Sequence, residues 1–137
     1  EASPERVFAA WASSEAKSQW FGSPDSAGNH QLDFHVGGTE SWRGEHGDSV
    51  FSYDATYQDI VENERIVYCY EMHLDGNKIS VSVTTIELVP VGAGTRLVLT
   101  EQGAYLDGYD DAGAREHGTN ELMDALGRSL EEEPVIA

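Results

Sequence analysis

The chain has 137 residues, of which 25 are acidic and 8 are basic, so its formal net charge at pH 7 is −17. A surface this acidic repels phosphate backbones and anionic lipid headgroups, which argues against nucleic acids and membranes as partners. The length suits one core, so we predict a single domain over residues 1–137. One cysteine, Cys69, cannot form an internal disulfide, which indicates a reducing, cytoplasmic compartment.

Two short helices are predicted at the start of the chain. Ser3-Pro4-Glu5-Arg6 combines a capping residue, a proline at the first helical position and an early acid, which predicts a helix over about 4–12. A second short helix begins at Ser13 or Ser14 and ends before Gly22.

The middle of the chain has the period of two that is typical of β-strands. Asp75-Gly76-Asn77 is a strong hairpin signal between two of these segments. In the segment after it, Ile79, Val81 and Val83 alternate with three small polar residues, as in a strand with one apolar face. Trp42 lies in a continuation of the first segment, and a turn is predicted over 44–48. The five predicted antiparallel strands cover about 31–36, 49–60, 65–74, 79–89 and 95–101.

A long helix is predicted near the end of the chain, from about Ala112 or Ala114 to Glu132. Gly118 and Gly127 are unusual inside it, because each costs ~1 kcal/mol relative to alanine. An antiparallel sheet with one apolar face needs a cover, and this helix is the natural one. We expect a ligand-sized space between the sheet and the helix.

Seven short stretches resemble one protein family in their order and spacing. They are Arg6–Trp11, Gln19–Gly22, Val36–Gly38, Tyr57–Ile60, Glu64–Tyr68, Gly94–Leu97 and Glu116–Gly118. Together with a leucine face on the last helix, they are similar to the activator of heat shock protein 90 ATPase homologue-1-like family. This family belongs to the START-like, SRPBCC or Bet v 1-like superfamily, and the resemblance covers nearly all of residues 4–131.

The resemblance implies an α+β helix-grip fold. In this fold a curved antiparallel sheet wraps around a long C-terminal helix, and two short helices precede the sheet. The family has a strand before the first helix, so we expect that strand to be missing from the given sequence. The family commonly has tryptophan after the glycine of the last helix, where this chain has Thr119. A smaller residue there is expected to enlarge the cavity or to alter the packing of the helix.

Aromatic residues on the predicted strands are candidates for a ligand-binding wall. They supply an apolar lining whose hydroxyl groups orient a ligand. The alternative is that they form the sheet core, and alternation does not show which face is concave. The predicted ligand-binding residues are Trp20, Phe34, Trp42, Tyr53, Tyr57, Tyr68, Tyr70 and Met123.

Glu101 and His117 are the candidate catalytic residues. A carboxylate in an apolar cavity has a raised pKa and acts as a general acid or base, with the histidine as its partner. The alternative is that both side chains are exposed and pair with neighbours. Asp33-x-His35 has no companion metal-binding motif, so no metal or other cofactor is expected.

Three functions follow, in order of preference. The first is binding of a small apolar or aromatic molecule without catalysis. The second is a co-chaperone-like interaction module that stimulates a chaperone ATPase, as the family resemblance implies. The third is a cyclase-like enzyme that uses a cavity acid or base. An exposed strand edge also allows self-association as a dimer.

Overall fold

A six-stranded antiparallel sheet, with its strands side by side in chain order, carries the helices on one side. The computed structural model describes residues 2–21 and 30–132. The helices are α1 (Pro4–Ala12), α2 (Ser14–Lys17) and α3 (Ala112–Glu132). The strands are β1 (His30–Leu32), β2 (Thr39–His46), β3 (Ser49–Val61), β4 (Arg65–Leu74), β5 (Asn77–Val91) and β6 (Gly94–Tyr105).

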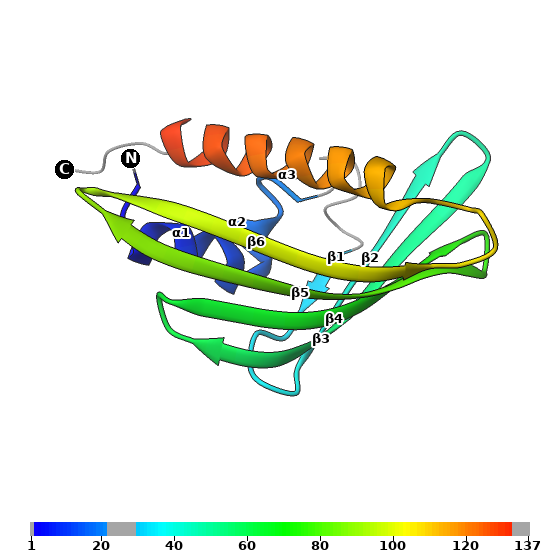
Figure 1. Cartoon of the computed structure of the whole chain (residues 1–137), viewed down its shortest axis with the longest axis horizontal. Helices are drawn as coiled ribbons and strands as arrows, with labels where there is room; N and C mark the ends of the chain where they lie inside the picture. The colour runs from blue at the N-terminus through cyan, green and yellow to red at the C-terminus, as the bar shows by residue number, and fades with distance from the viewer. Residues whose placement is uncertain (1, 22–29, 133–137) are drawn as a thin grey trace.

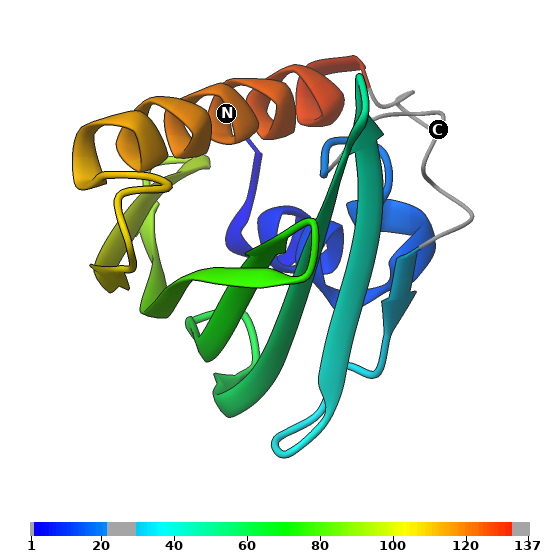
Figure 2. The ribbon, with the colours of Figure 1, turned by 90° about the vertical axis from the view of Figure 1, so that its right-hand side faces the viewer.

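The sheet curves beneath α3, which runs across it as a long cover, and α1 and α2 lie on the same side (Figures 1 and 2). This arrangement confirms the helix-grip fold predicted from the sequence. No helix in the described part of the chain has the length and apolar character needed to cross a membrane.

The helix starts follow the predicted capping chemistry. The Ser3 hydroxyl accepts a hydrogen bond from the backbone N–H of Arg6 at 3.3 Å, and Ser13 does the same for Ala16 at 3.1 Å. At α3, the carboxylate of Asp111 accepts from the backbone N–H of Ala114 at 2.9 Å. Side chains therefore satisfy part of the unpaired backbone at each helix start.

The first predicted strand is shorter than expected. β1 ends at Leu32, whereas alternation predicted a strand to residue 36. The chain turns instead, because Gly37 adopts a φ of +87° and its N–H donates to the carbonyl of Tyr57 at 2.8 Å. Phe34 still packs inward against Phe8, with ring centroids 5.6 Å apart.

Two other boundaries also differ from the prediction. β2 continues through Gly44 to His46, although a turn was predicted over 44–48. A Cβ atom at Gly44 would lie 2.2 Å from the Trp42 ring, so this glycine makes room for the indole within a strand. β6 likewise continues to Tyr105, beyond the predicted end at 101.

β5 turns its small polar residues inward, which its sequence pattern did not indicate. Met72 pairs with Ser80 and His73 with Lys78, so Ile79 is an extra residue in β5. This bulge changes the phase of the strand. Ile79 and Ser80 are both buried, and Val81 beyond them is 43% exposed on the outer face.

Along β5 after the bulge, the first inward-facing residues are therefore polar and the later ones are apolar. Ser82 and Thr84 are buried on the concave face, followed by the fully buried Ile86. Val83, between them, is 39% exposed. Short side chains here fill less of the space beneath α3 than valines do, and they supply hydroxyl groups.

Candidate functional site

A cavity of about 280 Å³ opens between α3 and the sheet. Four aromatic rings contribute to its wall, and its far side is formed by α3. We call it the aromatic cavity. Its lining residues are Phe21, Trp42, Tyr53, Tyr70, Met72, Arg115, Gly118, Thr119 and Leu122. The volume lies just below the range of about 300–1,000 Å³ that is usual for small-molecule sites in proteins.

The aromatic rings contact one another edge to face or tilted, which fixes the shape of the wall. The centroid of Phe21 lies 5.1 Å from that of Tyr53, and the Tyr53 centroid lies 4.9 Å from that of Tyr70. On the α3 side, Gly118 contributes no side chain, and a Cβ atom built there meets nothing within 4 Å. The glycine therefore faces open space.

Arg115 is the only charged residue among the described residues that line the aromatic cavity. From α3 it reaches the sheet, where its guanidinium donates to the Tyr70 hydroxyl at 3.0 Å and to the Ser80 hydroxyl at 2.9 Å. It also donates to the carboxylate of Asp110 at 3.0 Å. These bonds connect the first turn of α3 to β4 and β5.

Glu101 lies next to this arginine in the same polar cluster. Its carboxylate accepts from the Tyr70 hydroxyl and from the Thr84 hydroxyl, both at 2.8 Å. Burial, together with the charge of Glu101, raises the pKa of Tyr70 to about 12, although Arg115 opposes the shift. Tyr70 therefore stays protonated. Its hydroxyl accepts a hydrogen bond from Arg115 and donates one to Glu101.

Two further cavities lie along α3. One, of about 440 Å³, is more polar and shares Arg115 and Thr119 with the aromatic cavity; Glu101, Tyr105 and Glu116 also line it. The other, of about 430 Å³, lies near the C-terminal half of α3. Apolar side chains dominate its wall, including Met123.

The predicted ligand-binding residues divide between cavity wall and core. Trp42, Tyr53 and Tyr70 line the aromatic cavity, while Met123 lines the cavity at the other end of α3. The remaining four belong to the core cluster or pack against it and line none of these three cavities. They are Trp20, Phe34, Tyr57 and Tyr68.

The two predicted catalytic residues lie in different surroundings. Glu101 belongs to the part-buried polar cluster around Arg115, whereas the side chain of His117 is 79% exposed. The nearest charged partner of His117 is Glu121, one turn along α3, at 3.9 Å. The structure therefore does not bring Glu101 and His117 together. The described residues also include no group of three or more His, Cys, Asp or Glu side chains placed to hold a metal ion.

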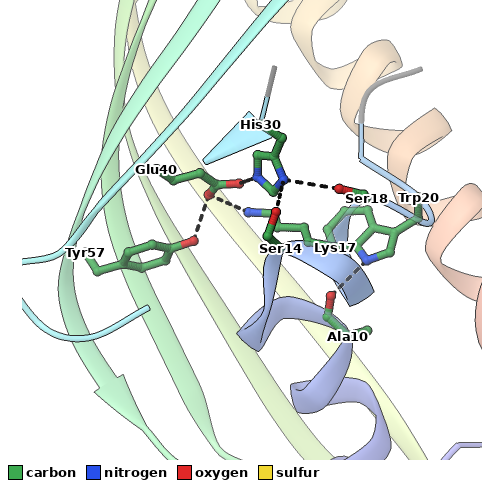
Figure 3. A network of polar contacts seen from close by, with 8 residues as sticks. All are labelled: Ala10, Ser14, Lys17, Ser18, Trp20, His30, Glu40 and Tyr57. Carbon is green, nitrogen blue, oxygen red and sulfur yellow. Dashed lines mark hydrogen bonds and ion pairs between the residues drawn. The ribbon is translucent and has the colours of Figure 1, made fainter. Parts of the chain in front are cut away.

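A second polar cluster surrounds a fully buried ion pair between α2 and β2 (Figure 3). Lys17 of α2 and Glu40 of β2 form an ion pair at 2.7 Å, and neither side chain is exposed. The Tyr57 hydroxyl donates to the same carboxylate at 2.7 Å. His30 Nε2 lies 2.6 Å from the other carboxylate oxygen, and its Nδ1 lies 3.3 Å from the Ser14 hydroxyl.

Aromatic rings surround the ammonium group of Lys17. Its Nζ lies 4.7 Å from the centroid of Phe21 and 5.2 Å from that of Trp11. Burial lowers the pKa of Lys17, and Glu40 offsets this only in part. Burial alone would raise the pKa of Glu40, but the charge of Lys17 and the hydrogen bonds from its neighbours hold it at about 2.

The cluster around Lys17 and Glu40 does not line the aromatic cavity, but it positions one of the residues that do. Phe21, which lies over Lys17 Nζ, is a wall residue of the cavity, so the ion pair fixes a ring at the binding surface. Neither Lys17, Glu40 nor Arg115 was singled out from the sequence. The sequence feature that could have drawn attention to Lys17 is the rarity of lysine, since the chain has only two lysines. Nothing local marks Glu40 as its partner, 23 residues away.

A family model shows the family of this chain, and solved structures show its fold. A family model described as Activator of Hsp90 ATPase homolog 1-like protein matches residues 1–131. A search of the curated proteins found no match. An uncharacterised protein from Rhizobium leguminosarum is similar in structure, with 46% identity, a TM-score of 0.92, and coverage of 96% of this chain and 89% of that one.

Other solved structures extend the likeness. The Mll3558 protein from Rhizobium loti has 44% identity and a TM-score of 0.87, and the match covers 93% of this chain and 89% of that one. Protein CV1439 from Chromobacterium violaceum has 22% identity and a TM-score of 0.77, with coverage of 96% and 92%. At that identity the likeness shows the fold alone.

The buried ion pair gives a testable prediction for stability. Lys17→Met leaves the Glu40 carboxylate buried without its cation, and we expect a loss of roughly 3–5 kcal/mol in the free energy of unfolding. The double variant Lys17→Met/Glu40→Gln should lose less than the sum of the two single variants. Urea unfolding of all four proteins measures this coupling. Single-variant losses that simply add would contradict the assigned pair.

The lowered pKa of Glu40 predicts a pH dependence. Between its ordinary value of 4.5 and about 2, the unfolded chain binds a proton at Glu40 that the folded chain does not. Stability from this residue is therefore present above pH 4.5 and is lost as the pH falls to about 2, by roughly 3 kcal/mol. Urea unfolding across this range should show a shallower fall for Glu40→Gln than for the unmodified chain. Parallel curves would rule out this role.

Proposed function

Because the chain belongs to the Activator of Hsp90 ATPase homolog 1-like family, with a helix-grip fold that leaves a cavity beneath α3, we propose that it binds a small apolar or aromatic molecule there. The aromatic cavity is the observation that carries the proposal. Its wall combines rings from β2, β3, β4 and the segment that follows α2 with Gly118 of α3, which has no side chain.

Burial and packing support binding at this cavity. Rings and aliphatic groups gain most from contact with an apolar ligand, at roughly 25 cal/mol per Å² removed from water. The wall is held in place from two sides: the Lys17–Glu40 pair lies behind Phe21, and Arg115 bonds to Tyr70. A wall fixed before binding loses little conformational entropy when the ligand arrives.

A cavity-filling experiment tests the proposal. The full chain is titrated with N-phenyl-1-naphthylamine, a neutral fluorophore that brightens in apolar surroundings, and we expect saturable binding of one molecule. Gly118→Leu places a side chain in the aromatic cavity and should reduce the affinity at least tenfold. The same substitution removes a helix glycine, so it should not destabilise the fold.

Gly127→Leu is the matched control for this experiment. Gly127 lies on the same helix, and a Cβ atom there also meets nothing within 4 Å, but it lines the cavity at the other end of α3. We expect its affinity for the probe to equal that of the unmodified chain. Equal loss in both variants, or no effect in either, would place the probe elsewhere and contradict the proposal. Native mass spectrometry with solvent extraction then identifies any molecule that copurifies.

A protein partner is the second candidate function. The family description names activation of a chaperone ATPase, and a net charge of −17 suits a basic surface on such a partner. Adding the purified chain to a bacterial chaperone of this class should then raise its ATP turnover. An unchanged turnover at saturating concentration would exclude this function for that chaperone.

Catalysis is the third reading, and it depends on Glu101. The carboxylate lines the polar cavity with Tyr105 and Glu116 in the same wall. His117 is too exposed to share a proton with it in this arrangement. A cyclase-like reaction would therefore use Glu101 with Tyr70, which already donates to it, rather than the pair expected from the sequence.

A further inference from the structure

Arg115 carries N–H groups that no other described residue uses. A guanidinium has five N–H donors. Its Nη1 donates once, to Tyr70, and its Nη2 donates twice, to Ser80 and Asp110. The Nε–H and the second Nη1 hydrogen have no acceptor among the described residues. Both belong to a side chain that is only 10% exposed and that lines the aromatic cavity.

Unused donors in a mainly apolar wall favour a ligand that brings its own acceptor. A guanidinium N–H that has no protein acceptor can donate to a correctly placed oxygen of a ligand, and a hydrogen bond from a charged donor is stronger than one from a neutral donor. The other described residues of this wall are aromatic, aliphatic or small, so the wall has no second charged side chain that could contact a ligand. The cavity thus has one charged group on a mainly apolar surface that also carries the hydroxyls of Tyr53 and Tyr70, and a few polar groups on an apolar wall are the pattern that orients a ligand.

The charges around Arg115 favour a neutral acceptor over a carboxylate. Asp110 already pairs with the guanidinium at 3.0 Å. Glu101 lies two hydrogen bonds away, through Tyr70, which accepts from the arginine and donates to the glutamate. Glu116 lines the adjoining polar cavity. One positive charge therefore faces at least two negative ones, and an additional anion is repelled.

We infer that the ligand of the aromatic cavity is a neutral aromatic compound with one hydrogen-bond-accepting oxygen, such as a ketone, and that Arg115 donates to this oxygen. The inference rests on the proposed function, since it names the class of molecule bound at that site. The rings of Phe21, Trp42 and Tyr53 contact the apolar body of the ligand.

Three probes of one shape test the inference on the full chain. They are naphthalene, 2-acetylnaphthalene and 2-naphthoate, which differ in having no oxygen, a neutral carbonyl and a carboxylate. We expect the ketone to bind about tenfold more tightly than naphthalene, because a hydrogen bond from a charged donor is worth about that factor. The carboxylate should bind more weakly than the ketone.

Variants assign these differences to Arg115 and its neighbour. Arg115→Met should remove the preference for the ketone, so that the ketone and naphthalene bind this variant with affinities within about threefold of each other. Arg128→Met is the matched control, an exposed arginine on the same helix, and should change nothing. Asp110→Asn, which removes a negative charge beside the guanidinium, should strengthen the binding of 2-naphthoate.

The outcomes separate the inference from the proposed function. Binding of naphthalene and ketone with equal affinity would overturn the inference and leave the cavity as a binding site. Tightest binding of 2-naphthoate to the unmodified chain would also overturn it, in favour of an anionic ligand. If Arg115→Met weakened naphthalene and the ketone by the same factor and so kept the preference for the ketone, the inference would also be overturned, and the arginine would only support the wall. Failure of all three probes to bind would overturn both proposals.

Discussion

The ion pair between Lys17 and Glu40 is the interaction on which the rest of the interior depends. Two opposite charges without any solvent exposure are tolerated only because they neutralise each other and every remaining oxygen has a donor. The pair connects α2 to β2, and His30 extends it to β1. Phe21 lies over the ammonium group, so the position of a cavity wall residue follows from an electrostatic contact deeper in the core.

The cavity exists because the concave face is not filled to the density of an ordinary core. The bulge at Ile79 turns the short side chains of Ser82 and Thr84 inward beside the cavities, and α3 contributes Gly118 to the wall of the aromatic cavity. Arg115 holds α3 to the sheet by hydrogen bonds to Tyr70 and Ser80. Because α3 is held to the sheet at this point and the side chains nearby are small, a cavity remains that close packing would have filled.

The helix starts and the order of helices and strands could be predicted, because caps, periodicity and hairpin turns are encoded in neighbouring residues, and the helix-grip fold followed from the family resemblance. Three cavity residues, Trp42, Tyr53 and Tyr70, were also predicted. The inward face of β5 could not be predicted, because the extra residue, Ile79, reverses the alternation and no feature of the neighbouring sequence marks it. Arg115 was missed for a similar reason: its partners come from strands more than 30 residues away.

The burial of Lys17 has a practical consequence for surface chemistry. With one of its two lysines sealed inside the core, the chain offers a single lysine amine to acylating reagents, that of Lys78. Lys78 lies at the start of β5, beside the β4–β5 hairpin, and its side chain is 45% exposed. A fluorophore or an immobilisation linker attached through lysine will therefore occupy one defined point of the folded protein.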